Sequence, residues 1–401
     1  MTTALAAHAT HPDARMALAL AAAQIEARRA AVPAGGAPFA PTLGLLYLSD
    51  RCADQAEALL ADARQRWPGV QWAGCVGVGV IASGVEYIDE PALALLLLDL
   101  PAAQFRLFNG RQPMDARLAH TALVHVDPAT PDLAELIDEL AGRTGSGVLF
   151  GGLAASRSRS LHIADGVFQG GLSGVAFDAG VPLLSRVTQG CQPVGPARRI
   201  SDCDGNLVLA LDGQPALPLL LADLGLTLDR PQQAVAVLRA TLAGLGDPAA
   251  ADDGDERSGE AATPLLGRGG QFGEHTRVRH LIGIDPARQG VAIADLVHPG
   301  QALAFCRRDT EAARRDLVRI CTEIRDELEA EAPATRRIAG AVYVSCSGRG
   351  GPHFGGPSAE ALIVQHALGE VPLVGFFAAG EIARDALVGY TGVLTVFTSP
   401  A

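Results

Sequence analysis

The sequence predicts an α+β fold of two related modules, in which mixed, mainly antiparallel sheets carry helices on their outer faces. Strand-like runs outnumber helix-like runs, and many follow one another directly, which disfavours a doubly wound parallel sheet. One pattern, β-α-β-turn-β, occurs three times along the chain. The composition, 48% hydrophobic and 19% charged residues, is that of a chain that can bury a sizeable core.

Breaks in composition divide the 401 residues into three parts. Residues 1–36 are expected to form an N-terminal helix, because an Ala-rich run is followed by the Gly- and Pro-rich stretch 33–41. The two modules then occupy residues 37–214 and 215–401. The second module contains the acidic segment 245–264, which is poor in large apolar residues and is expected to be a flexible loop.

The repeated pattern gives twelve of the expected elements. In order, they are 42–49, 54–67, 70–79 and 91–100; 122–127, 131–141, 147–156 and 170–178; and 341–347, 358–368, 371–380 and 390–397. In each repeat the helix joins two parallel strands, and the last strand returns as an antiparallel neighbour. The second strands share small residues at Gly74–Gly79, Gly151–Ser156 and Gly375–Gly380. This likeness predicts three related units.

Other segments are predicted as two hairpins, one strand and a long amphipathic helix, at 198–213, 276–297, 301–309 and 310–332. Asp204-Gly205 is a strong two-residue turn signal for the first hairpin. Asp309 or Thr310 is expected to cap the helix. These elements lie outside the three repeats.

Charge and cysteine content exclude several classes of function. Lys and Arg number 32 and Asp and Glu 44, for a net charge of −12, which disfavours nucleic acids and anionic membranes as partners. The seven cysteines are scattered and odd in number, as expected of reduced thiols in a cytoplasmic protein. The longest apolar run, residues 92–98, is too short to span a bilayer as a helix.

A glycine-rich loop, "SCSGRGGPHFGGPSAEA" at residues 345–361, lies between a predicted strand and a predicted helix. Such an arrangement is common at phosphate sites, but a P-loop needs Lys-Ser/Thr where this chain has Gly356-Pro357. A dinucleotide fingerprint needs a third glycine where His353 stands. The loop therefore lacks the residues that carry nucleotide chemistry.

The loop can still contact a smaller ligand. The helix that follows Ser358, its expected N-cap, offers free N–H groups to an anion, and Arg349 can pair with it. Equally, the glycines can form a tight turn while Arg349 caps a carbonyl. Glu381, a lone acid in an apolar stretch, can bind a ligand ammonium, hold Arg349 or lie exposed in a loop. Phe376 and its neighbour point to opposite faces of a strand, so at most one of them lines a pocket.

Cysteine and histidine chemistry suggests two more functions. Cys346 beside His353 could act as a nucleophile, although an inert buried cysteine is the more common case. A single histidine can ligate haem, and His353 is the first candidate, followed by His162 and His298. A surface or satisfied histidine is the ordinary alternative for each.

The C-terminal half resembles the FIST family (F-box and intracellular signal transduction proteins). The residues that carry the resemblance are "HLIGIDPARQGVAIADLVHPGQALAFCRRDTEAARRDL" (280–317), "AVYVSCSGRGG" (341–351) and "VPLVGFFAAGEIA" (371–383). The N-terminal half is similar more loosely, through "GCVGVGVIASGVEY" (74–87) and "PALALLLLDLP" (91–101). The resemblance implies a sensory domain that binds a small ligand such as an amino acid, and some bacterial relatives bind haem and sense nitric oxide.

Together these observations predict a bacterial, cytoplasmic sensor, not an enzyme, which binds a small polar ligand and acts through a separate signalling protein. The expected ligand-binding residues are Cys346, Gly348, Arg349, Gly350, His353, Phe376, Gly380 and Glu381. No metal or cofactor is expected, except that His353 is the candidate ligand in a haem-binding nitric-oxide sensor. The same residues are also compatible with a protein-interaction scaffold that binds no ligand and with a Cys346-dependent enzyme.

Overall fold

The computed structural model describes residues 3–30, 39–117, 119–227, 231–246, 265, 266, 272, 276–330 and 336–400. The chain forms two compact units. Unit 1 contains residues 1–188 and 314–401, and unit 2 contains residues 189–313. Unit 2 is therefore inserted in the chain of unit 1, a division that differs from the expected boundary between residues 214 and 215. Of the expected acidic loop, residues 247–264 lie outside the described part of the chain.

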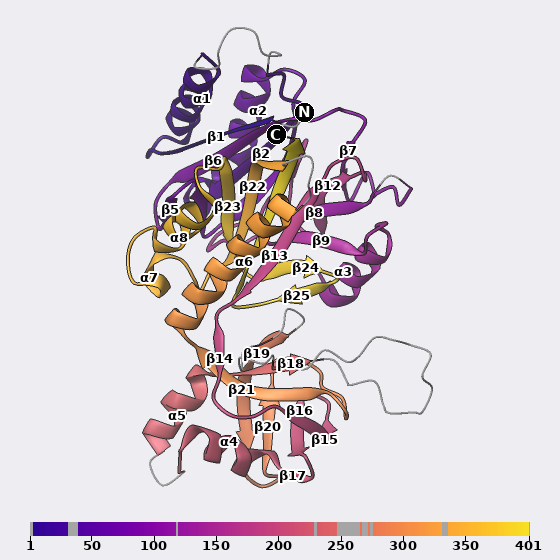
Figure 1. Cartoon of the computed structure of the whole chain (residues 1–401), viewed down its shortest axis with the longest axis vertical. Coiled ribbons are helices and arrows are strands. Elements are labelled where there is room, and N and C mark those ends of the chain that lie inside the picture. The colour runs from indigo at the N-terminus through magenta and orange to yellow at the C-terminus, as the bar shows by residue number, and fades with distance from the viewer. Residues whose placement is uncertain are drawn as a thin grey trace. The chain divides into compact units, whose positions relative to one another are not determined.

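Unit 1 consists of the three predicted repeats (Figure 1). The first contains β1 (Thr3–Thr10), α1 (Ala14–Ala30), β2 (Leu43–Ser49), α2 (Ala56–Arg66), β3 (Gln71–Gly77), β4 (Gly79–Ala82), β5 (Val85–Ile88) and β6 (Ala92–Asp99). The second contains β7 (Phe105–Asn109), β8 (Thr121–Val126), α3 (Leu133–Gly142), β9 (Val148–Leu153), β10 (His162–Ala164), β11 (Val167–Phe168) and β12 (Leu172–Phe177). The third contains β13 (Leu183–Gln189), α6 (Thr310–Ala330), β22 (Arg336–Cys346), α7 (Gly351–Phe354), α8 (Ala359–Leu368), β23 (Leu373–Ala378), β24 (Glu381–Arg384), β25 (Ala386–Val388) and β26 (Thr391–Pro400).

The three sheets of unit 1 have the same strand order. It is β1-β6-β2-β3-β10-β11 in the first, β7-β12-β8-β9-β24-β25 in the second and β13-β26-β22-β23-β4-β5 in the third. In each, the strands before and after the crossover helix are parallel, and the last strand of the repeat returns antiparallel. The predicted mixed sheets and the predicted repeat are confirmed.

Each repeat also gives one hairpin to another sheet, which the sequence analysis did not predict. The hairpin β4–β5 pairs with β23, β10–β11 pairs with β3, and β24–β25 pairs with β9. The exchange is cyclic: the first repeat completes the third sheet, the third completes the second, and the second completes the first. No edge of the β3, β9 or β23 strands is left unpaired at these positions, so the exchange protects the sheets from edge-to-edge association.

Alternating side chains divide each strand between two cores. On β2, Leu45 and Tyr47 face a central core shared by all three sheets, while Leu46 and Leu48 face an outer core with α1 and α2. A further outer core lies between α3 and the second sheet, and contains Ile137. The period-2 pattern thus buries both faces of the sheets, with the helices on the outside, as predicted (Figure 1).

A glycine at the same place in each repeat allows close approach of the two parallel strands. A Cβ on Gly74, Gly151 or Gly375 would lie 1.9, 2.0 or 1.7 Å from the carbonyl oxygen of the residue opposite, Leu46, Val124 or Tyr343. Contacts this short are impossible for a side chain. The predicted likeness of the three second strands therefore has a steric cause.

Unit 2 is mostly antiparallel sheet. Its elements are β14 (Cys191–Pro193), β15 (Arg198–Asp204), β16 (Leu207–Leu211), β17 (Gln214–Pro215), α4 (Ala216–Leu224), α5 (Pro231–Ala240), β18 (Thr241–Gly246), β19 (Arg277–Asp285), β20 (Gly290–Ile293) and β21 (Ala302–Arg308). The order β15-β16-β20-β19-β18-β21 closes on itself, because β21 also pairs with β15. Both predicted hairpins, β15–β16 and β19–β20, are present.

The ends of several elements also match their sequence signals. The helix α6 begins at Thr310, and Asp309 Oδ1 accepts a hydrogen bond from Ala312 N at 2.7 Å, so Asp309 is the cap. The N-terminal helix is present as α1, but the preceding residues form β1, which pairs with β6 along its whole length. Within the described residues, no helix combines the length and the apolar character needed to cross a membrane.

Candidate functional site

The glycine-rich loop lies where the sequence placed it, between β22 and the helices α7 and α8. Gly350 has φ +81°, and a Cβ there would lie 3.1 Å from Phe377. A Cβ on Gly351 would lie 2.2 Å from the carbonyl oxygen of Gly356. Two of the loop glycines are therefore required for the turn itself, by conformation and by space.

A buried carboxylate occupies the centre of this loop. Glu360, the second residue of α8, is fully buried and accepts hydrogen bonds from Arg349 Nε at 2.8 Å and from Gly350 N at 2.8 Å. The hydroxyls of Tyr343 and Ser345 also donate to it, at 2.7 and 3.0 Å. The guanidinium of Arg349, itself 4% exposed, stacks over the ring of Phe354. Burial alone would lower the pKa of Arg349, but Glu360 raises it above its usual value.

A second carboxylate, from the first repeat, binds the remaining N–H groups. Glu86 on β5 accepts hydrogen bonds from Gly351 N at 2.5 Å and from Ala361 N at 2.9 Å. Burial raises its pKa, and these two N–H groups oppose the rise. Ser358 precedes α8 as expected, but its hydroxyl makes no capping bond to the helix; it accepts from Glu86 N at 3.0 Å. Ser358 therefore occupies the cap position while Glu86 caps the helix.

The loop is thus an anion site filled by the protein itself. Both carboxylates at this helix N-terminus, where the sequence analysis placed an anionic ligand, belong to the chain. Arg349 and the backbone of Gly350 contact Glu360 directly, so a ligand that uses them must displace a buried ion pair. Ligand contact at Gly348–Gly350 remains a prediction.

Glu381, the first residue of β24, and Cys346, the last residue of β22, lie next to each other. Glu381 is fully buried, and its Oε2 accepts from the hydroxyl and the N–H of Thr391, at 2.7 and 3.1 Å. Its Oε1 has no hydrogen-bond partner among the described residues. Burial raises the pKa of Glu381 to about 8, although Thr391, the charge of Arg349 and the Cys346 thiol lower it. Burial and Glu381 together raise the pKa of Cys346 to about 12, which is unsuited to a nucleophile at neutral pH.

The remaining expected site residues, Phe376, Gly380 and His353, each make contacts of their own. Phe376 points into the central core, stacked on Tyr47 with ring centres 5.1 Å apart, whereas Phe377 lies against the glycine loop. Gly380 accepts a hydrogen bond from Leu153 N through its carbonyl at 2.8 Å. His353 is half-buried on α7 beside Phe354. The structure therefore brings Cys346, Arg349, Gly350 and Glu381 together and directs Phe376 elsewhere.

The three haem candidates lie in different surroundings. His162 is 1% exposed, and its two nitrogens lie 2.7 Å from Ser173 Oγ and 3.0 Å from Gly170 O, so neither is available to iron. His298 is exposed on the surface of unit 2, and His353 is half-buried. Among described residues, no cluster of three or more His, Cys, Asp or Glu could hold a metal ion. His162 does not fit a haem ligand, and neither His353 nor His298 lines either of the two cavities described below.

A cavity of about 360 Å³ lies in unit 1, and we call it the polar cavity. It is lined by Leu5, Ala6, His8, Arg28, Ser83, Gln365, Glu370, Val371 and Pro372. These residues come from β1 and α1, from the turn between β4 and β5, from α8 and from the segment before β23. The first and third repeats together therefore surround one space.

The polar cavity combines groups of both charges. His8 Nδ1 lies 2.6 Å from Tyr87 Oη, and burial and the nearby Arg28 lower the pKa of His8, so its imidazole is neutral at pH 7. Arg28 donates to the carbonyl of Ala6 and stays exposed. Within the described part of the chain, the side chains of Gln365 and Glu370 make no hydrogen bond or ion pair. The cavity therefore offers a cation, a carboxylate and an amide to a small molecule.

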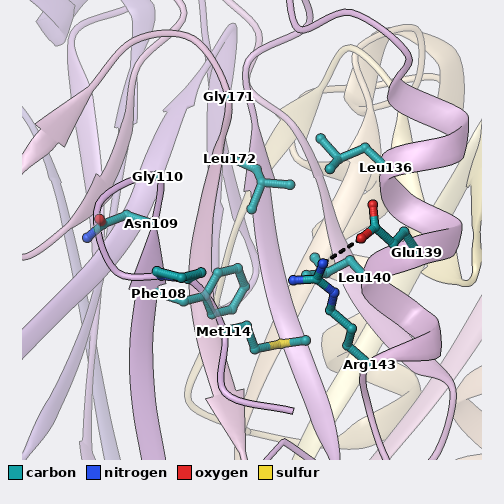
Figure 2. Close-up of a pocket in the computed structure, with 11 residues that line it drawn as sticks. Phe108, Asn109, Gly110, Met114, Leu136, Glu139, Leu140, Arg143, Gly171 and Leu172 are labelled. Carbon is teal, nitrogen blue, oxygen red and sulfur yellow. Dashed lines mark hydrogen bonds and ion pairs between the residues drawn. The ribbon is translucent and has the colours of Figure 1, made fainter.

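A second cavity, of about 270 Å³, lies against α3 and is mostly apolar (Figure 2). It is lined by Phe108, Asn109, Gly110, Pro113, Met114, Leu136, Glu139, Leu140, Arg143, Gly171 and Leu172. The only charged residues of this lining are Glu139 and Arg143, which form an ion pair. We call it the apolar cavity.

The sequence analysis missed Glu86, Glu360 and the polar cavity. Glu86 is a lone acid in an apolar strand, the same signal that singled out Glu381. Glu360 is an acid in the first turn of a helix, where it also complements the helix dipole. No local signal links His8 or Arg28 to Gln365, because they lie in the first and third repeats, at opposite ends of the sequence.

Comparison with known proteins identifies two family domains. The FIST N domain matches residues 42–214, and the FIST C domain matches residues 234–384. The uncharacterized protein Rv0628c of Mycobacterium tuberculosis is 32% identical over 419 residues, covering 97% of each chain. The uncharacterized protein Mb0898c of Mycobacterium bovis is 32% identical over 411 residues, covering 93% of this chain and 96% of the relative.

Among solved structures, T. maritima PurL complexed with ATP aligns with all of this chain and 72% of that chain. The TM-score is 0.24 and the sequence identity 12%. Similarity at that level says nothing about shared function.

Proposed function

Because the chain belongs to the FIST family, whose domains are sensory domains of signal-transduction proteins, we propose that it senses a small polar ligand of the amino-acid type bound in the polar cavity. The observation that carries the proposal is the set of polar groups that line this cavity. Arg28 matches a ligand carboxylate, Glu370 matches an ammonium, and the Gln365 amide can accept or donate. An amino acid carries both charges, on two groups attached to the same carbon atom.

The surroundings of the cavity suggest how binding is transmitted. Gln365 lies on α8, whose first turn holds Glu360 and is capped by Glu86. Ser83 holds the start of β23 through hydrogen bonds to Val371 O and from Leu373 N, at 2.9 and 3.1 Å. A ligand that draws Gln365 toward Arg28 acts on α8 and on the glycine loop together. The output then passes to a separate signalling protein, and no catalytic step is required.

Thermal unfolding in the presence of the twenty amino acids tests the proposal. A ligand at 100 times its Kd stabilises the folded state by about 2.7 kcal/mol, which is readily seen as a rise in Tm. We expect saturable stabilisation by at least one amino acid, lost in Arg28→Gln and in Glu370→Gln. Arg29→Gln is the matched control, because Arg29 is the next residue on α1, exposed and paired with Glu26.

Two results count against this function. If no amino acid shifts the wild-type Tm, the cavity does not bind this class of ligand, and a scaffold without a ligand becomes the better account. If Arg28→Gln responds as strongly as the wild type, the ligand binds elsewhere on the chain.

A further inference from the structure

The repeats differ in the helix that lies in the sequence between the outermost strand and the first strand of the β-α-β pattern. In the first repeat α1 packs on β1 and β6 beside α2, and its Leu18 and Ile25 are fully buried in the outer core. In the third repeat α6 lies beside α8, where Arg325 donates to Ala367 O, and it pairs through Glu323 with Arg186 of β13. Two repeats therefore cover the outer face of their outermost strands with a helix.

The second repeat has no helix at this position within its described residues. Its outermost strand β7 leads to β8 through residues 110–120, which are described except for residue 118. Met114 and Ala119 of this connection are buried against the outer core of α3 and cover part of the face that a helix covers elsewhere. The apolar cavity lies at the part of this face that remains uncovered.

The walls of this cavity are apolar on three sides. Phe108 and Leu172 come from β7 and β12, Met114 comes from the connection, and Leu136 and Leu140 come from α3 (Figure 2). Phe108, Met114 and Leu140 are almost fully buried, so they form a fixed floor. An apolar cavity of about 150 Å³ can hold benzene. A cavity of about 270 Å³ therefore has room for one aromatic ring or branched chain with a short substituent.

One charged group stands at the edge of the cavity. Arg143, at the end of α3, forms an ion pair with Glu139 one turn earlier, and both side chains are about half exposed. Such i,i+4 pairs contribute only about 0.3–0.5 kcal/mol. Arg143 can therefore exchange Glu139 for a ligand carboxylate at little cost, and a guanidinium binds a carboxylate through two parallel hydrogen bonds.

We propose that the apolar cavity is a second binding site, which takes a small aromatic or branched aliphatic monocarboxylate with its carboxylate on Arg143. The apolar part of the ligand replaces the side chains that a helix supplies in the other two repeats. The proposal is independent of the polar cavity, because the two cavities share no residue.

Titration calorimetry with phenylacetate, 4-methylpentanoate and the neutral 2-phenylethanol tests the proposal on the full chain. We expect one-to-one binding of phenylacetate, weakened about fivefold in Arg143→Gln, since an exposed ion pair contributes up to about 1 kcal/mol. Binding of 2-phenylethanol should change less than about twofold in the same variant, because its affinity comes from apolar contact. Arg66→Gln, at the end of the corresponding helix α2, is the control and should leave both unchanged.

Filling the cavity gives the second arm of the test. Leu136→Trp and Leu172→Trp each place an indole in the cavity from a half-buried position, and either variant that keeps the wild-type circular dichroism spectrum should lose both probes. The proposal is overturned if no probe saturates the wild-type protein at up to about 10 mM, a range that still detects binding of a few kcal/mol. It is equally overturned if a folded cavity-filled variant binds phenylacetate as the wild type does, or if Arg143→Gln weakens the acid and the alcohol alike.

Discussion

Replacing Arg349 with methionine tests whether its guanidinium serves the fold or a ligand. Arg349 Nε lies 2.8 Å from Glu360 Oε1, and the two side chains are 2% and 0% exposed. Two unit charges about 4 Å apart attract by about 4 kcal/mol at the effective dielectric constant typical of proteins. Removal of one partner of a buried pair typically costs about 3–5 kcal/mol, because the other charge is left uncompensated. Tyr343, Ser345 and Gly350 still donate to Glu360, which favours the lower end of that range.

The assay is urea unfolding followed by tryptophan fluorescence. The chain has two tryptophans, Trp67 and Trp72, and both lie in unit 1, so their emission reports the unit that contains Arg349. We expect a free energy of unfolding about 3 kcal/mol lower in Arg349→Met. Arg66→Met, at an exposed helix end, should change it by less than about 0.5 kcal/mol.

A double-mutant cycle with Glu360→Gln isolates the pair. The glutamine keeps an acceptor for Tyr343 and Gly350 but carries no charge, so the double variant should be more stable than the sum of the single losses by about 1–3 kcal/mol. A loss below about 1 kcal/mol in Arg349→Met, or strict additivity, would refute the reasoning. Arg349 would then be free to bind a ligand, as the sequence analysis expected.

Three further predictions concern the same unit. The pKa of Glu381 in the fold, about 8, lies above its usual value of 4.5, so between these pH values the folded chain retains a proton that the unfolded chain has lost. The free energy of unfolding should therefore fall by on the order of 4 kcal/mol as pH rises from 4.5 to 8. Glu381→Gln should remove most of this pH dependence when stability is measured by urea unfolding. Gly375→Ala places a Cβ 1.7 Å from a carbonyl oxygen and should lower the free energy of unfolding by about 3 kcal/mol or more. Gly356→Ala, with open space around its Cβ, should change the free energy of unfolding by less than about 1 kcal/mol. Equal losses in the two variants would contradict the steric account. Cys346 is buried and its pKa is raised to about 12, so it should react with iodoacetamide at pH 7.5 more than ~1,000-fold slower than an ordinary thiol. Fast labelling located at Cys346 by mass spectrometry would instead support a nucleophilic role.

The repeats could be predicted because each depends on local sequence. Strand, helix and strand follow hydrophobic period and length, and the shared Gly74, Gly151 and Gly375 reflect one steric need. The cap at Asp309 and the turn at Gly205-Asn206, one residue after the predicted Asp204-Gly205, likewise follow from short-range signals. Structure that depends on residues within about thirty positions of each other in the sequence was therefore largely predictable.

The exchange of hairpins could not be predicted in this way. β4 pairs with β23 although the two are almost three hundred residues apart, and the residues of β4 do not specify which strand it pairs with. Since any apolar strand can pair with any other, only the closed arrangement of three sheets fixes the choice. The closed sheet of unit 2 was missed for the same reason, because β21 meets β15 and β18 across long separations.

At the candidate site, sequence reasoning found the loop but did not identify the two carboxylates of the chain that bind there. Glycines, a helix N-terminus and an arginine do indicate a place for a carboxylate. Whether that carboxylate belongs to a ligand or to the chain depends on Glu86, which arrives with the exchanged hairpin. Glu360 could have been considered as the source of this carboxylate, since it is the acid in the first turn of the same helix.

The exchange also bears on how the two family domains function. The FIST N match contains β4, β5, β9 and β13, and each of these strands belongs to a sheet that it shares with β23, β24 or β26 of the third repeat. The two matched regions therefore do not form separate folded bodies in unit 1. Arg28 and Gln365 face one cavity from opposite ends of the sequence, and Glu86 of one region caps a helix of the other. The ligand that we propose for the polar cavity would contact Arg28 and Gln365 together, and thus residues of unit 1 from before and after the insertion of unit 2.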